Sequence, residues 1–317
     1  MPDRPPRLLP APLLGLIAAL ALIIASAAAP VHAGDIKVVA SFSILADLVG
    51  EVGGDRVSVT SLVKADEDAH GYQPKPSDSR LLRDAHLVVA NGLGFDTWIQ
   101  RLGAAASKDD KLVIASDGIV PLESEHTHGA DHAGHDHGAL DPHAWQDVSN
   151  ARVYAANIAK ALAAADPAHA NDYRANLARI DKQLEELDHE IHAAMAALPE
   201  NRRTIVTSHE AFAYFGRAYD IRLLAASGVS TSAEPSAAGI ARLIRQIRRE
   251  KAAAAFLENI SDPRAIERIS KESGASIGGT LYSDALSGAD GPAPTYIAMM
   301  RHNLETLIKA LSAPRTP

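Results

Sequence analysis

One long amphipathic helix, expected over residues 167–198, constrains the fold of this chain more than any other feature. Its apolar residues recur at spacings of three and four, with charged residues between them, until Pro199 ends the pattern. These apolar positions are Tyr173, Leu177, Ile180, Leu184, Leu187, Ile191, Met195 and Leu198. A helix of roughly 30 residues is about 45 Å long. Because this is too long for a crossover inside one small domain, we expect it to link two lobes.

Short β-branched runs alternate with helical patterns on both sides of this helix. The runs expected to be strands are IKVVASF, RVSVTSLV, LVVANG and KLVIASDG before it and RTIVTS, IRLLAAS, AAAAFLEN and SIGGTLY after it. Strands that alternate with helices are typical of mostly parallel sheets. The predicted fold class is therefore α/β, with an N-terminal lobe over 34–166, a rigid linking helix over 167–198 and a C-terminal lobe over 199–317. Open α/β sheets bind ligands at the carboxyl ends of their strands, so we expect the ligand in the cleft between the lobes.

Residues 1–33 have the layout of a secretory signal peptide. Arg4 and Arg7 precede an apolar run from about Leu13 to Ala29, and a motif of small residues ends at Ala33. The run is short for a membrane span of about 20 residues. The chain contains no cysteine, so it has no thiol for a disulfide or a lipid anchor. We expect a soluble, monomeric protein in a Gram-negative periplasm, cleaved near Ala33.

The charge of the chain limits its partners. The formal net charge is −8, and no block of basic residues interrupts the sequence. This balance argues against nucleic acid or an anionic membrane surface as a partner.

Three histidines and one aspartate lie where predicted strands or loops end. His70 in DAHGYQPKPSD and His143 in LDPHAWQD belong to the first lobe, and His209 in IVTSHEAFAYF and Asp284 in GTLYSDALS belong to the second. A cleft between the lobes would bring all four together. Three imidazoles and a carboxylate suit Zn²⁺, and Mn²⁺ or iron would accept them with a bidentate carboxylate or added water. Spacing alone does not distinguish such a site from ordinary loop and core residues.

The segment HTHGADHAGHDHG, residues 126–138, is a second candidate for metal binding. Its five histidines are His126, His128, His132, His135 and His137. No apolar residue in it can pack against a core, so it cannot fix ligands with the precision of a high-affinity site. We expect weak, plural binding that collects zinc or receives it from a periplasmic donor. The alternative is a solvated loop without a role.

The whole series of motifs resembles the zinc- and manganese-specific substrate-binding proteins of bacterial ABC importers, the metal-binding cluster A-I (cluster 9) family. The resemblance is carried, in order, by VVASFSILADLVGEVGGDRVSVTSLV, DAHGYQPKPSD, NGLGFDTWI, DPHAW, TSHEAFAYF and TLYSDALS. It implies two α/β lobes joined by a rigid helix, and it implies that His70, His143, His209 and Asp284 are the metal ligands. The segment 126–138 is similar to the histidine-rich loop of zinc-type members.

The expected function is capture of zinc with high affinity and its delivery to the permease of an ABC transporter, without enzymatic activity. Relatives that look manganese-selective carry glutamate at the position of His209, and imidazole there favours zinc. Manganese or iron as cargo is the alternative within the same class.

Two alternatives come from other classes. One is a zinc-dependent hydrolase that uses the three histidines with Glu210 as general base. This enzyme would need an open fourth position, which Asp284 closes. The other is a surface adhesin, against which the absence of a cysteine for lipidation counts.

Overall fold

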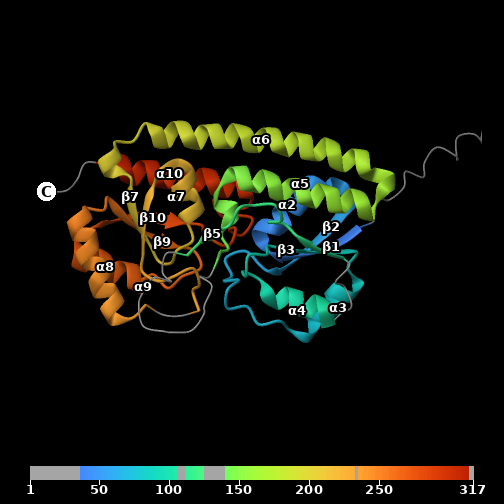
Figure 1. Cartoon of the computed structure of the whole chain (residues 1–317), viewed down its shortest axis with the longest axis horizontal. Helices are drawn as coiled ribbons and strands as arrows, with labels where there is room; N and C mark the ends of the chain where they lie inside the picture. The colour runs from blue at the N-terminus through green and yellow to red at the C-terminus, as the bar shows by residue number, and fades with distance from the viewer. Residues whose placement is uncertain (1–35, 106–110, 125–139, 233–234, 314–317) are drawn as a thin grey trace, which may run out of the picture. The chain divides into compact units, whose positions relative to one another are not determined.

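The computed structural model describes residues 36–105, 111–124, 140–232 and 235–313 (Figure 1). The expected signal peptide at 1–33 and the histidine-rich segment at 126–138 lie outside the described residues. Residues 34–317 form one compact unit. Among the described helices, none combines the length and the apolar character needed to cross a membrane.

The first lobe is built on a four-stranded parallel sheet with the order β2-β1-β3-β4. Its strands are β1 (Ile36–Phe42), β2 (Val57–Val63), β3 (Leu87–Ala90) and β4 (Leu112–Ile114). All of β1 except Lys37 is buried, as expected for a parallel strand covered on both faces. The covering helices are α2 (Ser43–Gly53) and α5 (Val148–Ala165) on one face and α3 (Pro76–Asp84) and α4 (Thr97–Ala105) on the other (Figure 1).

The second lobe repeats this plan with the strand order β10-β9-β7-β8, again parallel. Its strands are β7 (Thr204–Thr207), β8 (Arg222–Ala225), β9 (Ala254–Glu258) and β10 (Ser276–Leu281). Its helices are α7 (Ala213–Tyr219), α8 (Ala237–Glu250), α9 (Arg264–Ser273) and α10 (Tyr296–Ser312). In each sheet the strand order reverses at one point, between β1 and β3 and between β7 and β9, and such points are where open α/β sheets bind ligands.

Helix α6 (Ala170–Ala196) runs along both lobes (Figure 1). It has 27 residues and is therefore about 40 Å long. It contacts α2 and α5 of the first lobe and α7 and α10 of the second. Its buried side chains are Tyr173, Ile180, Leu184, Leu187, Ile191 and Met195. The predicted fold class, two α/β lobes with parallel sheets and one long linking helix, is confirmed.

The structure differs from the expected elements in two places. The sequence pattern predicts a helix from about Glu210 to Ala218, but α7 begins at Ala213. The N–H groups of Glu210 and Ala211 bond instead to the carbonyls of Gly228 and His209 in a tight turn. A short antiparallel pair, β5 (Leu122–Glu123) and β6 (Leu140–Asp141), was not predicted. Two residues are too few to show a strand period.

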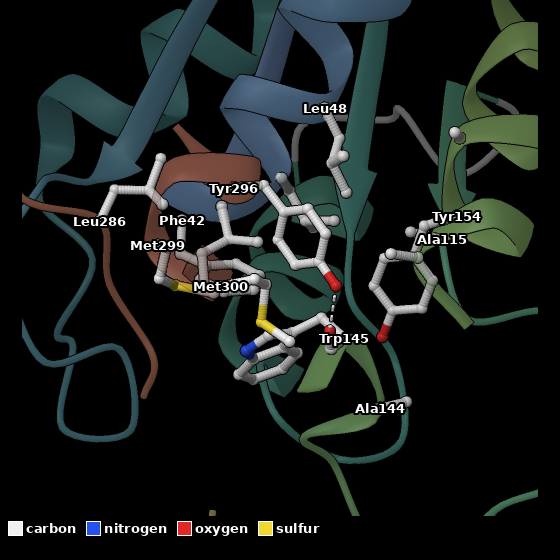
Figure 2. Packing of buried hydrophobic residues seen from close by; sticks show 14 of the residues in the cluster. Phe42, Leu48, Ala115, Ala144, Trp145, Tyr154, Leu286, Tyr296, Met299 and Met300 are labelled. Carbon is white, nitrogen blue, oxygen red and sulfur yellow. Dashed lines mark hydrogen bonds between the residues drawn. The ribbon is translucent and has the colours of Figure 1, made fainter. Parts of the chain in front are cut away.

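A shared aromatic core joins the two lobes. Trp145 is fully buried, and its ring centroid lies 5.0 Å from those of both Phe42 and Phe95. From the second lobe, the Tyr296 hydroxyl donates a 2.6 Å hydrogen bond to the carbonyl of Trp145 (Figure 2). The Trp145 indole N–H donates in turn to the carbonyl of Ser283 at 2.9 Å. Trp145 therefore packs against residues of the first lobe and is hydrogen-bonded to residues of the second.

Asp47 on α2 holds the first turn of α10, since its carboxylate accepts a 2.8 Å hydrogen bond from the N–H of Tyr296. Burial raises the pKa of Asp47 to about 6, although the bond from Tyr296 favours the charged form; Glu51 adds a smaller repulsion. The unfolded chain has the ordinary pKa near 3.8.

We predict that Asp47→Asn changes the pH dependence of stability. An acid whose pKa is raised in the folded state stabilises the protein at low pH. This stability is lost as the pH rises from the pKa of the acid in the unfolded chain to its pKa in the folded protein. The unfolding free energy of Asp47→Asn minus that of the parent should increase from about pH 4 to about pH 6 and then level off. The increase should be roughly 1 kcal/mol after allowance for solvent screening. Urea unfolding of metal-free protein measures it, and a pH-independent difference would contradict the prediction.

Candidate metal centre

The structure brings the four predicted ligands of the primary site together. His70 lies in the turn after β2, His143 lies just after β6, His209 follows β7, and Asp284 follows β10. One nitrogen or oxygen atom from each lies within 4.8 Å of the corresponding atoms of the others. This is the one such group found among the described residues. Two donors come from each lobe, so the cluster exists only when the lobes are together.

The separations between the donor atoms suit a small cation. The Nε2 atom of His70 lies 3.3 Å from Nε2 of His143 and 3.2 Å from Oδ2 of Asp284. Asp284 Oδ2 lies 3.1 Å from Nε2 of His209, and its Oδ1 lies 3.6 Å from Nε2 of His143. A tetrahedron with metal–ligand distances of about 2.0 to 2.1 Å has edges of about 3.3 to 3.4 Å. Four of the donor separations are therefore close to the edges of a tetrahedral coordination shell, and all four donors lie within 4.8 Å of one another.

The donors are almost completely shielded from water. His143 and Asp284 are 0% exposed and His209 is 1% exposed, whereas the side chain of His70 retains 5%. Phe95 packs edge-on against His70, with ring centroids 4.8 Å apart, and Trp145 packs against His143 at 5.3 Å. An apolar wall of this kind lowers the local dielectric and strengthens every electrostatic interaction inside it.

Asp141 orients His143. Its Oδ1 atom accepts from the backbone N–H of His143 at 2.9 Å and lies 2.7 Å from the ring Nδ1. The proton of the neutral imidazole is thus placed on Nδ1, so the Nε2 lone pair faces the cluster. The arrangement also raises the basicity of the ring as a ligand.

Glu258 plays the same part for His209. Its Oε2 atom lies 2.6 Å from Nδ1 of His209, and its Oε1 atom accepts from the backbone N–H groups of Ser208 and His209. Glu258 ends β9 and His209 follows β7, so they meet where the strand order of the second sheet reverses. The sheet topology therefore brings Glu258 and His209 together.

Electrostatics links His209 to the two acids around it. Burial opposes the charge on His209, but the carboxylates of Glu258 and Asp284 outweigh it and hold the pKa of His209 well above its usual value. Burial likewise opposes ionisation of Asp284, but His209 and His143 hold the pKa of Asp284 well below its usual range. The cluster thus attracts positive charge, and protons compete with a cation for it.

A buried polar network fixes the loops that carry Phe95 and His143. Asn91 donates from its side chain to the carbonyl of Pro142 at 2.9 Å and accepts from the Tyr154 hydroxyl at 2.6 Å. Asp96 accepts from the backbone N–H groups of Asn91 and Gly92. With these loops held by buried hydrogen bonds, the position of His143 is set before a cation arrives.

The hydrolase alternative does not fit this geometry. Asp284 lies among the three histidines, in the position that a catalytic water would need. Glu210 accepts a hydrogen bond from Ser124 and does not belong to the cluster. It therefore has no place as a general base.

Sequence reasoning singled out the four residues that cluster in the structure but missed the acids that orient two of them. A signal was present for Asp141, which lies two residues before His143 in LDPHAW. Glu258 ends an otherwise apolar strand, AAAAFLE, and a charge in that position is a weaker signal. The secondary histidines at 126, 128, 132, 135 and 137 lie outside the described residues.

Comparison with known proteins extends these observations. A family model described as "Zinc-uptake complex component A periplasmic" (ZnuA) matches residues 38–310. The manganese-binding lipoprotein MntA of Halalkalibacterium halodurans is 36% identical over 277 residues, which are 87% of this chain and 89% of that protein. The iron-binding protein YfeA of Yersinia pestis is 32% identical over 273 residues, covering 86% of this chain and 85% of that protein.

Two solved structures share the fold over nearly their full length. The periplasmic zinc-binding protein TroA from Treponema pallidum matches with a TM-score of 0.79 at 27% identity, covering 87% of this chain and 99% of that chain. The Mn-bound periplasmic metal-binding protein from Candidatus Liberibacter asiaticus matches with a TM-score of 0.77 at 29% identity and the same coverage.

We predict that Asp141→Asn weakens metal binding without unfolding the protein. The amide can still accept from His143, but it removes the negative charge that makes the imidazole a stronger ligand. Affinity for zinc should fall about tenfold or more, as measured by competition with a chelator of known affinity. Asp290→Asn, a charge removal on an exposed loop, is the matched control and should bind like the parent. Equal affinities in both variants would show that Asp141 does not tune the site.

Proposed function

This chain belongs to the family of the periplasmic component A of zinc-uptake complexes, the metal-binding components of ABC importers and not enzymes, and we propose that its own cargo is zinc. The observation that carries the proposal is the donor set: three imidazole nitrogens and one carboxylate, at separations that suit tetrahedral coordination. We assign His70, His143, His209 and Asp284 as the ligands.

The choice between metals rests on His209. Relatives of this chain are named for manganese, iron and zinc, so family membership leaves all three open. Zinc binds more tightly than manganese or iron(II) to a given nitrogen and oxygen site, and each imidazole in place of a carboxylate adds to that preference. With His209 present, Asp284 is the one carboxylate among the four donors. Manganese remains the alternative, because both oxygens of Asp284 lie near histidine donors and permit bidentate binding.

The cellular setting is part of the proposal. We assign residues 1–33 as a signal peptide, 34–166 and 199–317 as the two lobes, and 167–198 as the link between them. Several relatives are named as lipoproteins, but these 317 residues contain no cysteine that could carry a lipid. A free periplasmic monomer that delivers zinc to a membrane permease therefore fits the sequence best.

We predict one tightly bound zinc ion per mature chain and poor competition by manganese. The physical reason is the order of divalent-metal affinities at an imidazole-rich site. Competition titrations of untagged protein with both metals measure this preference. His143→Ala, which removes a fully buried donor, should abolish tight binding. Manganese binding as tight as zinc would contradict the choice of cargo, and unchanged affinity in His143→Ala would contradict the ligand assignment.

The histidine-rich segment 126–138 is proposed as a collecting arm that binds zinc weakly or receives it from a periplasmic donor. Its five imidazoles lie just before LDPHAW in the sequence, so zinc held by the arm would be close in the chain to a ligand of the primary site.

We predict that deletion of residues 126–138 removes weak zinc equivalents and leaves the tight site unchanged. Each weak arrangement must order backbone at about 1 to 2 kcal/mol per residue before it gains metal bonds, whereas the four primary donors are positioned by the fold. Isothermal titration over a wide range of zinc concentrations separates the two classes. Loss of the tight site, with the circular dichroism spectrum unchanged, would mean that the arm itself is the site.

A further inference from the structure

Asp68 connects a metal ligand to the opposite lobe. It is half-buried and lies two residues before His70 in the turn after β2. Its Oδ1 atom accepts a 2.9 Å hydrogen bond from the backbone N–H of His70. Its Oδ2 atom accepts a 2.6 Å hydrogen bond from the hydroxyl of Thr231, which belongs to the second lobe. The two oxygens of one carboxylate therefore join His70 to the segment that contains Thr231.

Residues 227–232, here called the crossing segment, lie beside the metal centre. Ser227 and Thr231 line a hollow of about 490 Å³ together with Asp68 and His209. Val229 and Ser230 line a second hollow, of about 750 Å³, together with His70. The crossing segment thus lies between the two open spaces that reach the ligands.

The two ends of the crossing segment are held differently. At its start, Ser227 donates from its backbone and its hydroxyl to the carbonyl of Ser208, and the carbonyl of Gly228 accepts from the N–H of Glu210. These bonds stay within the second lobe. Farther along, Thr231 makes the bond to Asp68 of the first lobe. The segment can therefore move at Thr231 while its start remains attached.

His70 is the ligand best placed to separate from the metal first. Its side chain is the most exposed of the four donors, at 5%, and it is carried by a turn between elements. The start of this turn is itself fastened to the second lobe, because Asp66 accepts from the side chain of Asn259 and from the N–H of Gly288. With Asp66 anchored there, displacement of the turn centres on residues 68–70.

We propose that Asp68 is a positioning residue that couples the crossing segment to His70 and so sets the rate at which the metal leaves. While Thr231 is bonded to Asp68, the carboxylate keeps both the segment and the N–H of His70 in place, and the ion is enclosed. When this bond breaks, the segment moves away from the centre and His70 loses a support at the same time. The inference rests on the proposed function, since it concerns release of the ion held by the four assigned ligands.

The test compares zinc release from variants that differ by single polar groups. Thr231→Val keeps the shape of the side chain and removes the hydroxyl, and Thr231→Ser keeps the hydroxyl and removes a methyl group. Ser230→Ala is the matched control, since the Ser230 hydroxyl bonds to Ser232 within the same segment. Zinc-loaded protein is mixed with an excess of a fluorescent chelator. The rate of zinc dissociation is taken from the range in which the observed rate no longer depends on the chelator concentration.

Zinc should leave Thr231→Val about tenfold faster or more, because the lost bond ends on a charged acceptor. Thr231→Ser and Ser230→Ala should release zinc within about twofold of the parent rate. Asp68→Asn should also release faster, and the double variant Asp68→Asn with Thr231→Val should be no faster than the faster single variant, because the two residues act through one bond. A Thr231→Val rate equal to that of the parent, or additive effects in the double variant, would overturn the proposal.

Equilibrium binding separates this proposal from the assignment of the ligands. Each variant and the parent are titrated with zinc, and each should bind one ion tightly per chain. If the parent itself lacks a tight site, the proposed function fails. If the parent binds zinc tightly and the release rates of Thr231→Val and Thr231→Ser are equal, the coupling through Asp68 fails alone. A lower melting temperature of Thr231→Val without faster release would assign Thr231 a purely structural role and would also overturn the coupling.

Discussion

Negative charge buried between the lobes is the constraint on which the rest of this structure depends. Asp141, Glu258 and Asp284 are each at most 4% exposed, and all three lie within 3.6 Å of an imidazole nitrogen of the cluster. Removing carboxylates from water costs several kcal/mol each unless positive charge lies beside them. Histidine protons can supply part of that charge, and a divalent cation supplies more from a single position. The buried carboxylates therefore destabilise the cluster when no positive charge lies beside them, and they favour the state in which a cation is bound.

The two-lobe architecture follows from where those acids and histidines lie in the chain. His143 and Asp141 belong to the first lobe, and Glu258 and His209 belong to the second, so neither lobe holds all four residues of the cluster. Helix α6 sets the spacing of the lobes, because one buried apolar stripe contacts helices of both. Trp145 then joins them at the core, with Tyr296 and Ser283 bonded to it from the second lobe. A fixed spacing and a shared core restrict how far the lobes can separate, so local segments beside the centre are the natural places for release to begin.

Much of this fold was predictable because its signals are local. The strand IKVVASF and the apolar stripe of α6 appear in the structure where the sequence places them. A short run rich in β-branched residues marks the strand, and apolar residues at spacings of three and four mark the helix. That the four candidate residues lie together was predictable because each follows a strand or a loop, and parallel sheets gather such positions at one edge. Their spacing in the sequence does not show that these four residues form one site, and the resemblance to a known family supplied that expectation.

The remaining features depend on contacts between distant residues. Glu258 meets His209 across 49 positions and Asp68 meets Thr231 across 163, and no periodicity in the sequence indicates either pair. At Glu210 the local pattern was misleading, because it predicted that the helix starts there. A hydrogen bond to Gly228 holds Glu210 in a turn instead. Local propensity was overridden by tertiary structure at the point where the chain places His209.

The distribution of roles around the centre separates affinity from selectivity. Asp141 and Glu258 make their imidazoles better donors for any divalent cation, so they strengthen binding without deciding which metal is bound. Selectivity lies in the number and kind of donors. Four of the separations between them are 3.1 to 3.6 Å, and all lie within 4.8 Å. Expansion to the six ligands that manganese favours needs water or the second oxygen of Asp284. The kind of donor, three imidazoles with one carboxylate, is therefore the feature that supports the proposal of zinc as cargo.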